Sequence, residues 1–284
     1  MPPRDNPTAR QARLGAELRK LRESAGKTAR EAAGLISTDQ ARISHIEAGR
    51  SGIGEARIRR LAIFYGCDDR ALIDALCAIS LEHRGQFWWD EYRGVLAPGF
   101  LDVSELEHHA RHMRCLQSVT LPGLLQTPEY ARALFDGVLP KLPAEEVEAR
   151  VEHRMRRQSV LHRESPPRFE AIVHEASLRM RVGGRTVARE QLEHLLKSAE
   201  LDAVTIRVIP FASDRFVEVT QTVLYVGGIV PELDTVHVDA PFGGVHLDAA
   251  ADLRRYRMQL DFAREVSLPP EESRSFIHHI ARDM

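Results

Sequence analysis

The apolar residues of the first 80 positions recur at helical spacing in five short segments. Leu14, Leu18 and Leu21 lie three or four residues apart, and Gly26 follows at a position that suits a helix-ending glycine. Further segments with this spacing lie around 28–36, 40–48, 58–65 and 68–79. The pattern predicts a small all-α domain of five helices over residues 1–80.

The second and third of these segments have clear boundary signals. Thr28 and Glu31 form the Thr-x-x-Glu pattern of a capping box, in which each residue satisfies a free backbone N–H of the other. Asp39 is a favourable N-cap, and Gly49 is expected to end a third helix at 40–48. Two short helices joined by a tight turn predict a helix-turn-helix.

The third helix has only a narrow apolar stripe, formed by Ile43 and Ile46. The residues that remain outward near its amino-terminal half are Gln40, Arg42, Ser44 and His45. Gln suits the edge of adenine, Arg that of guanine, and Ser either. Any three-helix packing unit could show this pattern, but the capping box, the short turn and the basic surroundings favour DNA.

The formal net charge of −2 is unevenly distributed. Residues 1–66 hold 13 Lys and Arg against 7 Asp and Glu, whereas the remainder is acidic. A basic end on an acidic body is expected when one end meets a polyanion, although two solvated surfaces of opposite sign would give the same count.

The composition is that of an ordinary globular protein, with 43% hydrophobic and 28% charged residues in 284. We expect a cytoplasmic location, because no apolar run approaches the roughly 20 residues of a membrane span and the start has no secretory h-region. Cys67, Cys77 and Cys115 form no C-x-x-C pair, which favours reduced thiols over a metal site.

Beyond residue 103 the pattern mixes helices and strands. Helices are predicted at 104–118, 128–136, 144–162, 188–200, 249–266 and 270–282, and strands at 169–173, 204–209, 220–226, 235–239 and 244–248. We therefore expect a multidomain chain with an α+β carboxy-terminal domain over 104–284. Residues 81–103, which hold both tryptophans, are expected to be an aromatic junction.

Residues 14–66 resemble the XRE family of phage-repressor-like regulators, through "LGAELRKLRESAGKT", "ISHIEAGR" and "RIRRLAIFYG". The resemblance implies a five-helix, lambda-repressor-like fold, a recognition helix at 40–48 and an ion pair between Arg22 and Glu47. The family often has Gln at the position of Ala29, and that Gln touches a DNA phosphate. In this chain the contact is lost or moves to Arg30. The residues expected to touch DNA are Thr28, Arg30, Thr38, Gln40, Ala41, Arg42, Ser44, His45, Arg50 and Arg57.

The rest of the chain resembles the carboxy-terminal domain of actinobacterial WhiJ-like regulators, through "VTLPGLLQTPEYARALF", "RMRRQSVLHR", "QLEHLL" and "VTIRVIPF". Such proteins often occur beside a small partner protein. The resemblance implies a regulator or an antitoxin-like binder of that partner, and it supplies no effector.

This carboxy-terminal part offers few catalytic motifs. "VHEASL" at 173–178 lacks the second histidine of a zinc-protease motif, and no nucleotide-binding glycine pattern is present. The cluster of Arg154, Arg156 and Arg157 could hold an anion or a DNA phosphate, but a solvated helix face is the more ordinary interpretation.

The repeated His-x-Asp of "HVDAPFGGVHLD" is a second candidate. With Phe242 and Gly243 as the loop, His237 would face Asp248 and Asp239 would face His246 on one side of a hairpin. The ordinary interpretation of these two His–Asp pairs is that they are surface ion pairs. A metal site or a pH-sensitive ligand pocket is the functional one.

Together these features predict a non-enzymatic, sequence-specific DNA-binding transcription regulator without a cofactor, whose carboxy-terminal domain dimerises and binds a partner protein or ligand. The alternatives are an antitoxin-like protein that neutralises a small neighbour-encoded partner, and a metal-dependent enzyme. A homodimer is expected because one recognition helix contacts few base pairs. The residues expected to hold it together are Phe87, Trp88, Trp89, Tyr92, Leu260, Phe262, Phe276 and Ile280.

Overall fold

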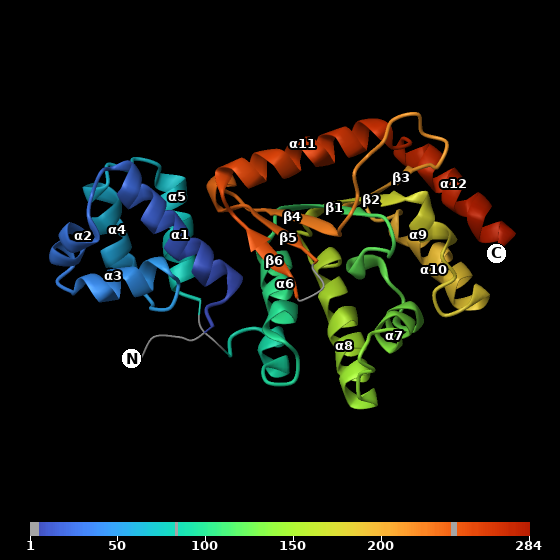
Figure 1. The fold of residues 1–284 in the computed structure, drawn as a ribbon, viewed down its shortest axis with the longest axis horizontal. Helices are drawn as coiled ribbons and strands as arrows, with labels where there is room; N and C mark the ends of the chain where they lie inside the picture. The colour runs from blue at the N-terminus through green and yellow to red at the C-terminus, as the bar shows by residue number, and fades with distance from the viewer. Residues whose placement is uncertain (1–5, 83–84, 240–242) are drawn as a thin grey trace. The chain divides into compact units, whose positions relative to one another are not determined.

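The computed structural model describes residues 6–82, 85–239 and 243–284, which form two compact units (Figure 1). The first unit comprises Met1–Glu91 together with Gly227–Asp234, and the second comprises Tyr92–Val226 together with Thr235–Met284. None of the described helices combines the length and apolar character that crossing a membrane requires.

The first unit is built from five α-helices, as the apolar spacing predicted. They are α1 (Ala9–Ser24), α2 (Ala29–Leu35), α3 (Gln40–Glu47), α4 (Glu55–Phe64) and α5 (Arg70–Ser80). Ile43 and Ile46 of α3 are buried in the shared core with Leu14 and Leu18 of α1. A short 3-10 helix, η1 (Trp88–Tyr92), follows.

The predicted caps define the helix-turn-helix. The hydroxyl of Thr28 accepts the Glu31 N–H at 3.2 Å, and the Thr28 N–H donates to the Glu31 carboxylate at 2.7 Å. The hydrogen bonds from Thr28 lower the pKa of Glu31. The Asp39 carboxylate accepts the Arg42 N–H at 2.6 Å and begins α3. Gly49 follows α3 with a φ of 71°, a left-handed value that favours glycine.

Helices α1 and α3 pack unusually closely at Gly15. A Cβ at this position would lie 2.5 Å from the carbonyl oxygens of both Ile46 and Glu47. Only a residue without a side chain permits that approach. The backbone of the carboxy-terminal turn of α3 is therefore seated directly against α1.

An ion pair ties the same two helices together. Arg22 donates from Nε to Glu47 at 2.6 Å and from Nη2 at 2.9 Å, and its Nη1 reaches the Lys27 carbonyl at 2.9 Å. The two side chains are only 11% and 10% exposed. A bidentate pair of this kind fixes orientation as well as supplying energy.

The segment Gly227–Asp234, which contains the 3-10 helix η4 (Pro231–Leu233), completes the first unit. Val230 is 4% exposed within the core formed by α1 to α5, and Leu233 packs against that core. Arg13 of α1 donates to the Glu232 carbonyl. A fragment that ends at residue 80 therefore lacks part of the core of this unit.

The second unit contains a six-stranded mixed sheet with the order β3-β2-β1-β4-β5-β6. Its strands are β1 (His112–Gln117), β2 (Arg168–His174), β3 (Val204–Ile209), β4 (Val223–Gly227), β5 (Thr235–Val238) and β6 (Val245–Leu247). The first three pair in parallel, whereas β4 with β5 and β5 with β6 pair antiparallel. Strand β1 thus lies between its parallel neighbour β2 and strand β4.

Parallel strands need long crossovers, and helices supply them here. The chain passes from β1 to β2 through the 3-10 helix η2 (Gly123–Leu125), α7 (Pro128–Asp136), α8 (Ala144–Arg157) and η3 (Gln158–Leu161), and from β2 to β3 through α9 (Glu175–Arg179) and α10 (Arg185–Ser198). Helix α6 (Pro98–His109) precedes the sheet, and α11 (Ala250–Val266) and α12 (Pro270–Asp283) follow it. The α+β prediction is confirmed.

The prediction of one helix over 104–118 is wrong in its second half. Helix α6 ends at His109, and residues 112–117 form β1. The sequence "HMRCLQ" has no β-branched residue, so its intrinsic preference is not for a strand. Pairing with β2 on one side and β4 on the other decides its conformation.

The two faces of the sheet differ in chemistry. Leu116, Val223 and Val236 project from one face into an apolar core with Leu253 and Leu260 of α11. Their neighbours along the strands, which include Cys115, Gln117, Leu224 and His237, line a cavity on the opposite face. Helix α11 covers the first face, and α6 and α8 lie over the second (Figure 1).

Several residues expected to pair two copies of the chain are used within one copy. Trp89 is 3% exposed, Tyr92 6%, Leu260 0% and Ile280 2%. Phe87 stacks on Trp89, with ring centroids 4.6 Å apart. The expectation that these buried side chains supply a dimer interface is wrong, because the core of the single chain already encloses them.

Gly15→Ala should destabilise the protein by about 1–3 kcal/mol, the usual cost of overpacking, because the new methyl group meets two carbonyl oxygens. Gly34→Ala in α2 is the control, since nothing lies within 4 Å of its Cβ position. That substitution should stabilise by about 0.4–1 kcal/mol. Urea denaturation of both variants measures the difference, and a Gly15→Ala protein as stable as wild type would disprove the close approach.

Glu47→Gln should cost about 3 kcal/mol of stability, because it removes the nearly buried carboxylate that pairs with the nearly buried guanidinium of Arg22. Glu23→Gln is the matched control: Glu23 also contacts Arg22, at 3.3 Å, but is 53% exposed. Its loss should cost less than about 1 kcal/mol. Thermal melts of the two variants test this, and equal losses would mean that burial does not strengthen the Arg22–Glu47 pair.

Candidate functional site

Helix α3 presents a polar surface opposite its buried stripe. Ile43 and Ile46 are 2% and 3% exposed, whereas Gln40, Ala41 and Ser44 are exposed. Arg42 and His45 are half-buried. The Arg42 guanidinium has one long contact, 3.5 Å to the Gly52 carbonyl, so the chain itself commits little of its hydrogen-bonding capacity.

The elements beside α3 carry further cationic groups. Arg30 on α2, Arg50 after α3 and Arg57 on α4 are exposed, and within the described chain they form no ion pair. By contrast, Arg59 pairs with both Glu55 and Asp74. Thr28 is exposed at the start of α2, and Thr38 is half-buried before α3. Uncommitted guanidinium groups beside a helix-turn-helix suit contact with phosphate.

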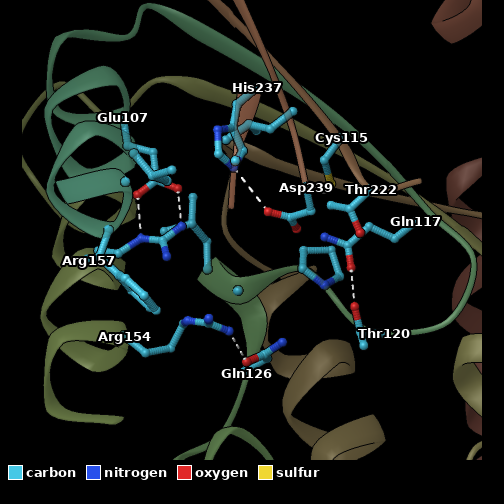
Figure 2. A pocket seen from close by; sticks show the side chains of 18 of the residues that line it. Glu107, Cys115, Gln117, Thr120, Gln126, Arg154, Arg157, Thr222, His237 and Asp239 are labelled. Atoms are coloured by element: carbon cyan, nitrogen blue, oxygen red, sulfur yellow. Dashed lines mark hydrogen bonds and ion pairs between the residues drawn. The ribbon is translucent and has the colours of Figure 1, made fainter. Parts of the chain in front are cut away.

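The second unit contains a cavity of about 670 Å³, within the range of about 300–1,000 Å³ typical of small-molecule sites. Figure 2 shows side chains that line it from β1 and the segment after it, from α6, from α8 and from β5. Its apolar lining includes Phe100, Leu121, Leu134, Phe135 and Val138, and its polar lining includes Gln117, Thr120, Gln126, Thr222 and Asp239.

The cavity lies where the order of the sheet reverses. The chain adds β2 and β3 on one side of β1 and then returns to place β4 on the other side. Gln117 at the carboxyl end of β1 and Asp239, just after β5, both line the cavity. In open sheets of this kind, the crevice outside such strand ends is the usual position of a ligand.

Two arginines of α8 enter the cavity in different states. Arg157 is fully paired, donating to Glu107 at 2.8 and 2.6 Å. Arg154 donates to the side-chain oxygen of Gln126 at 2.6 Å (Figure 2). Gln126 in turn donates to the Leu121 carbonyl at 2.6 Å, which fixes the amide so that its oxygen faces Arg154. The interpretation of these two arginines as a solvated helix face is therefore wrong.

The His-x-Asp hairpin has a different register from the one predicted. His237 lies opposite His246, and Val238 lies opposite Val245, so the connection is longer than two residues. Phe242, one of the two residues of the expected loop, lies outside the described residues. The predicted cross-strand pairs His237–Asp248 and Asp239–His246 are wrong, because the strands are offset by two residues.

The histidines and Asp239 instead form a chain of hydrogen bonds. His237 contacts His246 at 3.2 Å through Nδ1 and Asp239 at 3.1 Å through Nε2. Burial, and then the charge of His237, lowers the pKa of His246 to about 4. Burial alone would raise the pKa of Asp239, but the hydrogen bond from His237 and the nearby Arg154 and Arg157 charges lower it.

This cluster does not have the arrangement of a metal site. Across the described residues, no group of three His, Cys, Asp or Glu side chains is placed so that it could hold a metal ion. Asp248 does not line the cavity with the other three residues. What the structure brings together is a polar wall made of His237, Asp239 and His246.

The cavity arginines had a signal in the sequence. Val147 and Val151 form the buried stripe of α8, and Arg154 lies three residues after Val151, in line with that stripe. A basic residue that continues a buried stripe faces inward. That spacing distinguishes Arg154 from Arg156, which does not line the cavity. The cavity residues before β1, such as Glu107, and after β1, such as Thr120 and Gln126, had no spacing in the sequence that predicted an inward position.

Comparison with known families gives two matches. Residues 13–76 match a helix-turn-helix domain, which begins within α1, ends within α5 and points to a DNA-binding regulator. Residues 100–279 match a domain of unknown function, DUF5753, which gives no link to WhiJ-like regulators. No curated protein and no solved structure matches the chain. Because the second match spans more than half of the chain, the protein belongs to the DUF5753 family, with a helix-turn-helix domain in front of that domain.

Proposed function

We propose that this protein is a sequence-specific transcription regulator that reads the major groove with α3 and holds a small-molecule effector in its second unit. The observation that carries the proposed DNA recognition is the polar surface of α3 opposite the buried Ile43 and Ile46. The matched helix-turn-helix domain supports it. The cavity in the second unit supports the proposed binding of an effector.

The roles of the exposed residues follow from their chemistry. Gln40, Arg42 and Ser44 supply the hydrogen bonds that distinguish base edges, and Ala41 and His45 complete the surface that enters the groove. Arg30, Arg50 and Arg57 contact phosphates, helped by the hydroxyl groups of Thr28 and Thr38. In this arrangement α3 selects the sequence and its neighbours hold it in position.

Arg42→Ala and Gln40→Ala should each weaken binding to a selected operator by about 1–3 kcal/mol and relax the preference at particular base pairs. An operator is first obtained by selection from a random duplex pool with the full-length protein. Binding of each variant to that operator and to single-base variants gives the specificity. Full specificity in Arg42→Ala would show that α3 has another orientation on DNA.

Arg50→Ala and Arg57→Ala are the matched comparison for that experiment. Because phosphate contacts carry no sequence information, each loss should weaken all duplexes alike. The slope of log K against log salt should fall by about one per residue removed. A change in base preference would instead assign that arginine to base contact.

The two units also share a covalent path. Leu224 of β4 and His237 of β5 line the cavity, and the segment between these strands, Gly227–Asp234, forms part of the core of the DNA-binding unit. An occupant that shifts β4 or β5 is thereby linked to the helix-turn-helix through two short stretches of chain. A regulator with an effector needs such a connection.

The regulator is also proposed to act as a homodimer on an inverted repeat, with half-sites about 34–36 Å apart or a multiple of that spacing. Sedimentation of the full-length protein alone and with the selected operator tests this. We expect two chains per operator and a twofold-symmetric selected sequence. One chain per operator and a selected sequence without symmetry would exclude the dimer.

A further inference from the structure

Arg154 is a cationic group of the cavity that forms no ion pair with any of the described residues. Among the described residues, its hydrogen bond is to the neutral side-chain oxygen of Gln126, at 2.6 Å. Its Nε is buried without a partner, and no carboxylate of the described residues lies within ion-pair distance. A charged group without an ion-pair partner is costly to bury. A bound anion would reduce that cost.

The guanidinium is held ready for such a partner. It lies over the ring of Phe135, 4.8 Å from the centroid, and its side chain packs beside Gly123, where a Cβ would come within 3.2 Å of its Cδ. Gln126 fixes one amino group from another side. A stacked, fixed guanidinium loses little freedom on pairing with a planar anion.

We propose that the cavity binds a small organic carboxylate, with its carboxylate group on Arg154 and an apolar body against Phe100 and Phe135. This proposal rests on the effector role proposed for the second unit, and it names the chemical class of the effector. The apolar side of the cavity continues with Leu134 and Val138, next to the two aromatic rings. Small-molecule sites commonly combine such an apolar lining with a few fixed polar groups.

The charges around Arg154 favour a single negative charge over a phosphate monoester. Arg157, the neighbouring cation, is already neutralised by Glu107. Asp239 is kept ionised by its surroundings and also lines the cavity. A dianion would find only one guanidinium outside an ion pair, and these carboxylates would repel its two negative charges more strongly than a single charge. A carboxylate matches the one available guanidinium in charge and in planar shape.

The pKa of Arg154 agrees with this arrangement. Burial, and then the charge of Arg157, lower it to about 9, and the charges of Asp239 and Glu107 oppose that shift without cancelling it. A carboxylate bound to the guanidinium would favour the charged form and offset that cost. At neutral pH the side chain is still protonated, so the site is ready for an anion without a prior proton uptake.

The test uses the full-length protein and three probes with the same body: 4-phenylbutanoate, 4-phenylbutan-1-ol and 4-phenylbutyl phosphate. Thermal shift and calorimetry give the affinities. The acid should bind about tenfold or more tightly than the alcohol, because charge-assisted hydrogen bonds are the stronger kind. It should also bind more tightly than the phosphate.

Arg154→Gln removes the charge, and it should reduce acid binding about tenfold or more while leaving alcohol binding nearly unchanged. Arg156→Gln is the matched control on the same helix, since Arg156 does not line the cavity, and its acid binding should equal that of wild type. Absence of acid binding in wild type, equal binding of acid and alcohol, tighter binding of the phosphate, or full acid binding in Arg154→Gln would each overturn the proposal. If Arg154→Gln does not fold, the comparison of probes on wild type still decides.

Operator binding, measured on the same preparations, separates this proposal from the proposed function. Acid binding without operator binding would support the carboxylate site and overturn the regulator. Operator binding without acid binding would support the regulator and overturn the carboxylate site. A change in operator affinity of wild type on adding 4-phenylbutanoate, absent in Arg154→Gln, would support both together.

Discussion

A polar group on a buried sheet face must find a hydrogen-bond partner, and this constraint organises the second unit. Strand β1 directs Leu116 into the apolar core beneath α11, and its neighbours Cys115 and Gln117 into the cavity. A central strand flanked on both sides cannot turn these side chains toward solvent at its edge. Helices α6 and α8 therefore face the polar side with polar partners, and the cavity is the space that remains between them.

The arginines of α8 show how that requirement is met to different degrees. Arg157 has a complete bidentate partner in Glu107, so its charge belongs to the structure. Arg154 has only a neutral amide oxygen. A fold that needed only stability would gain from neutralising or replacing the second guanidinium. Its position beside a cavity, without an ion-pair partner, is the reason to connect it with a ligand.

The first unit depends on a different constraint, the fixed seating of α3. Gly15 admits the backbone of α3 against α1, and the Arg22–Glu47 pair holds the end of that helix. Val230 closes the same core from the connection between β4 and β5. The polar surface of α3 is therefore presented by a closely packed support, as the proposed contact with base edges requires. The support includes residues far along the chain from the helix-turn-helix.

The sequence by itself determined what depends on local chemistry. Helical spacing, the Thr28–Glu31 box, the Asp39 cap and Gly49 were enough to place the helix-turn-helix and its outward side chains. Family resemblance added the partners Arg22 and Glu47. Most strands of the sheet were also visible, because runs such as 204–209 are rich in β-branched residues.

Only the tertiary structure decided what depends on contacts between distant residues. The chain at 112–117 became a strand because two neighbours pair with it, and the register of β5 with β6 placed His237 opposite His246. The separate states of Arg154 and Arg157 depend on Gln126 and Glu107, which lie 28 and 50 residues away. Local sequence specifies caps and periodicity because those interactions span a few residues. Cavities and counter-charges form between elements, so their chemistry is fixed only when the elements pack.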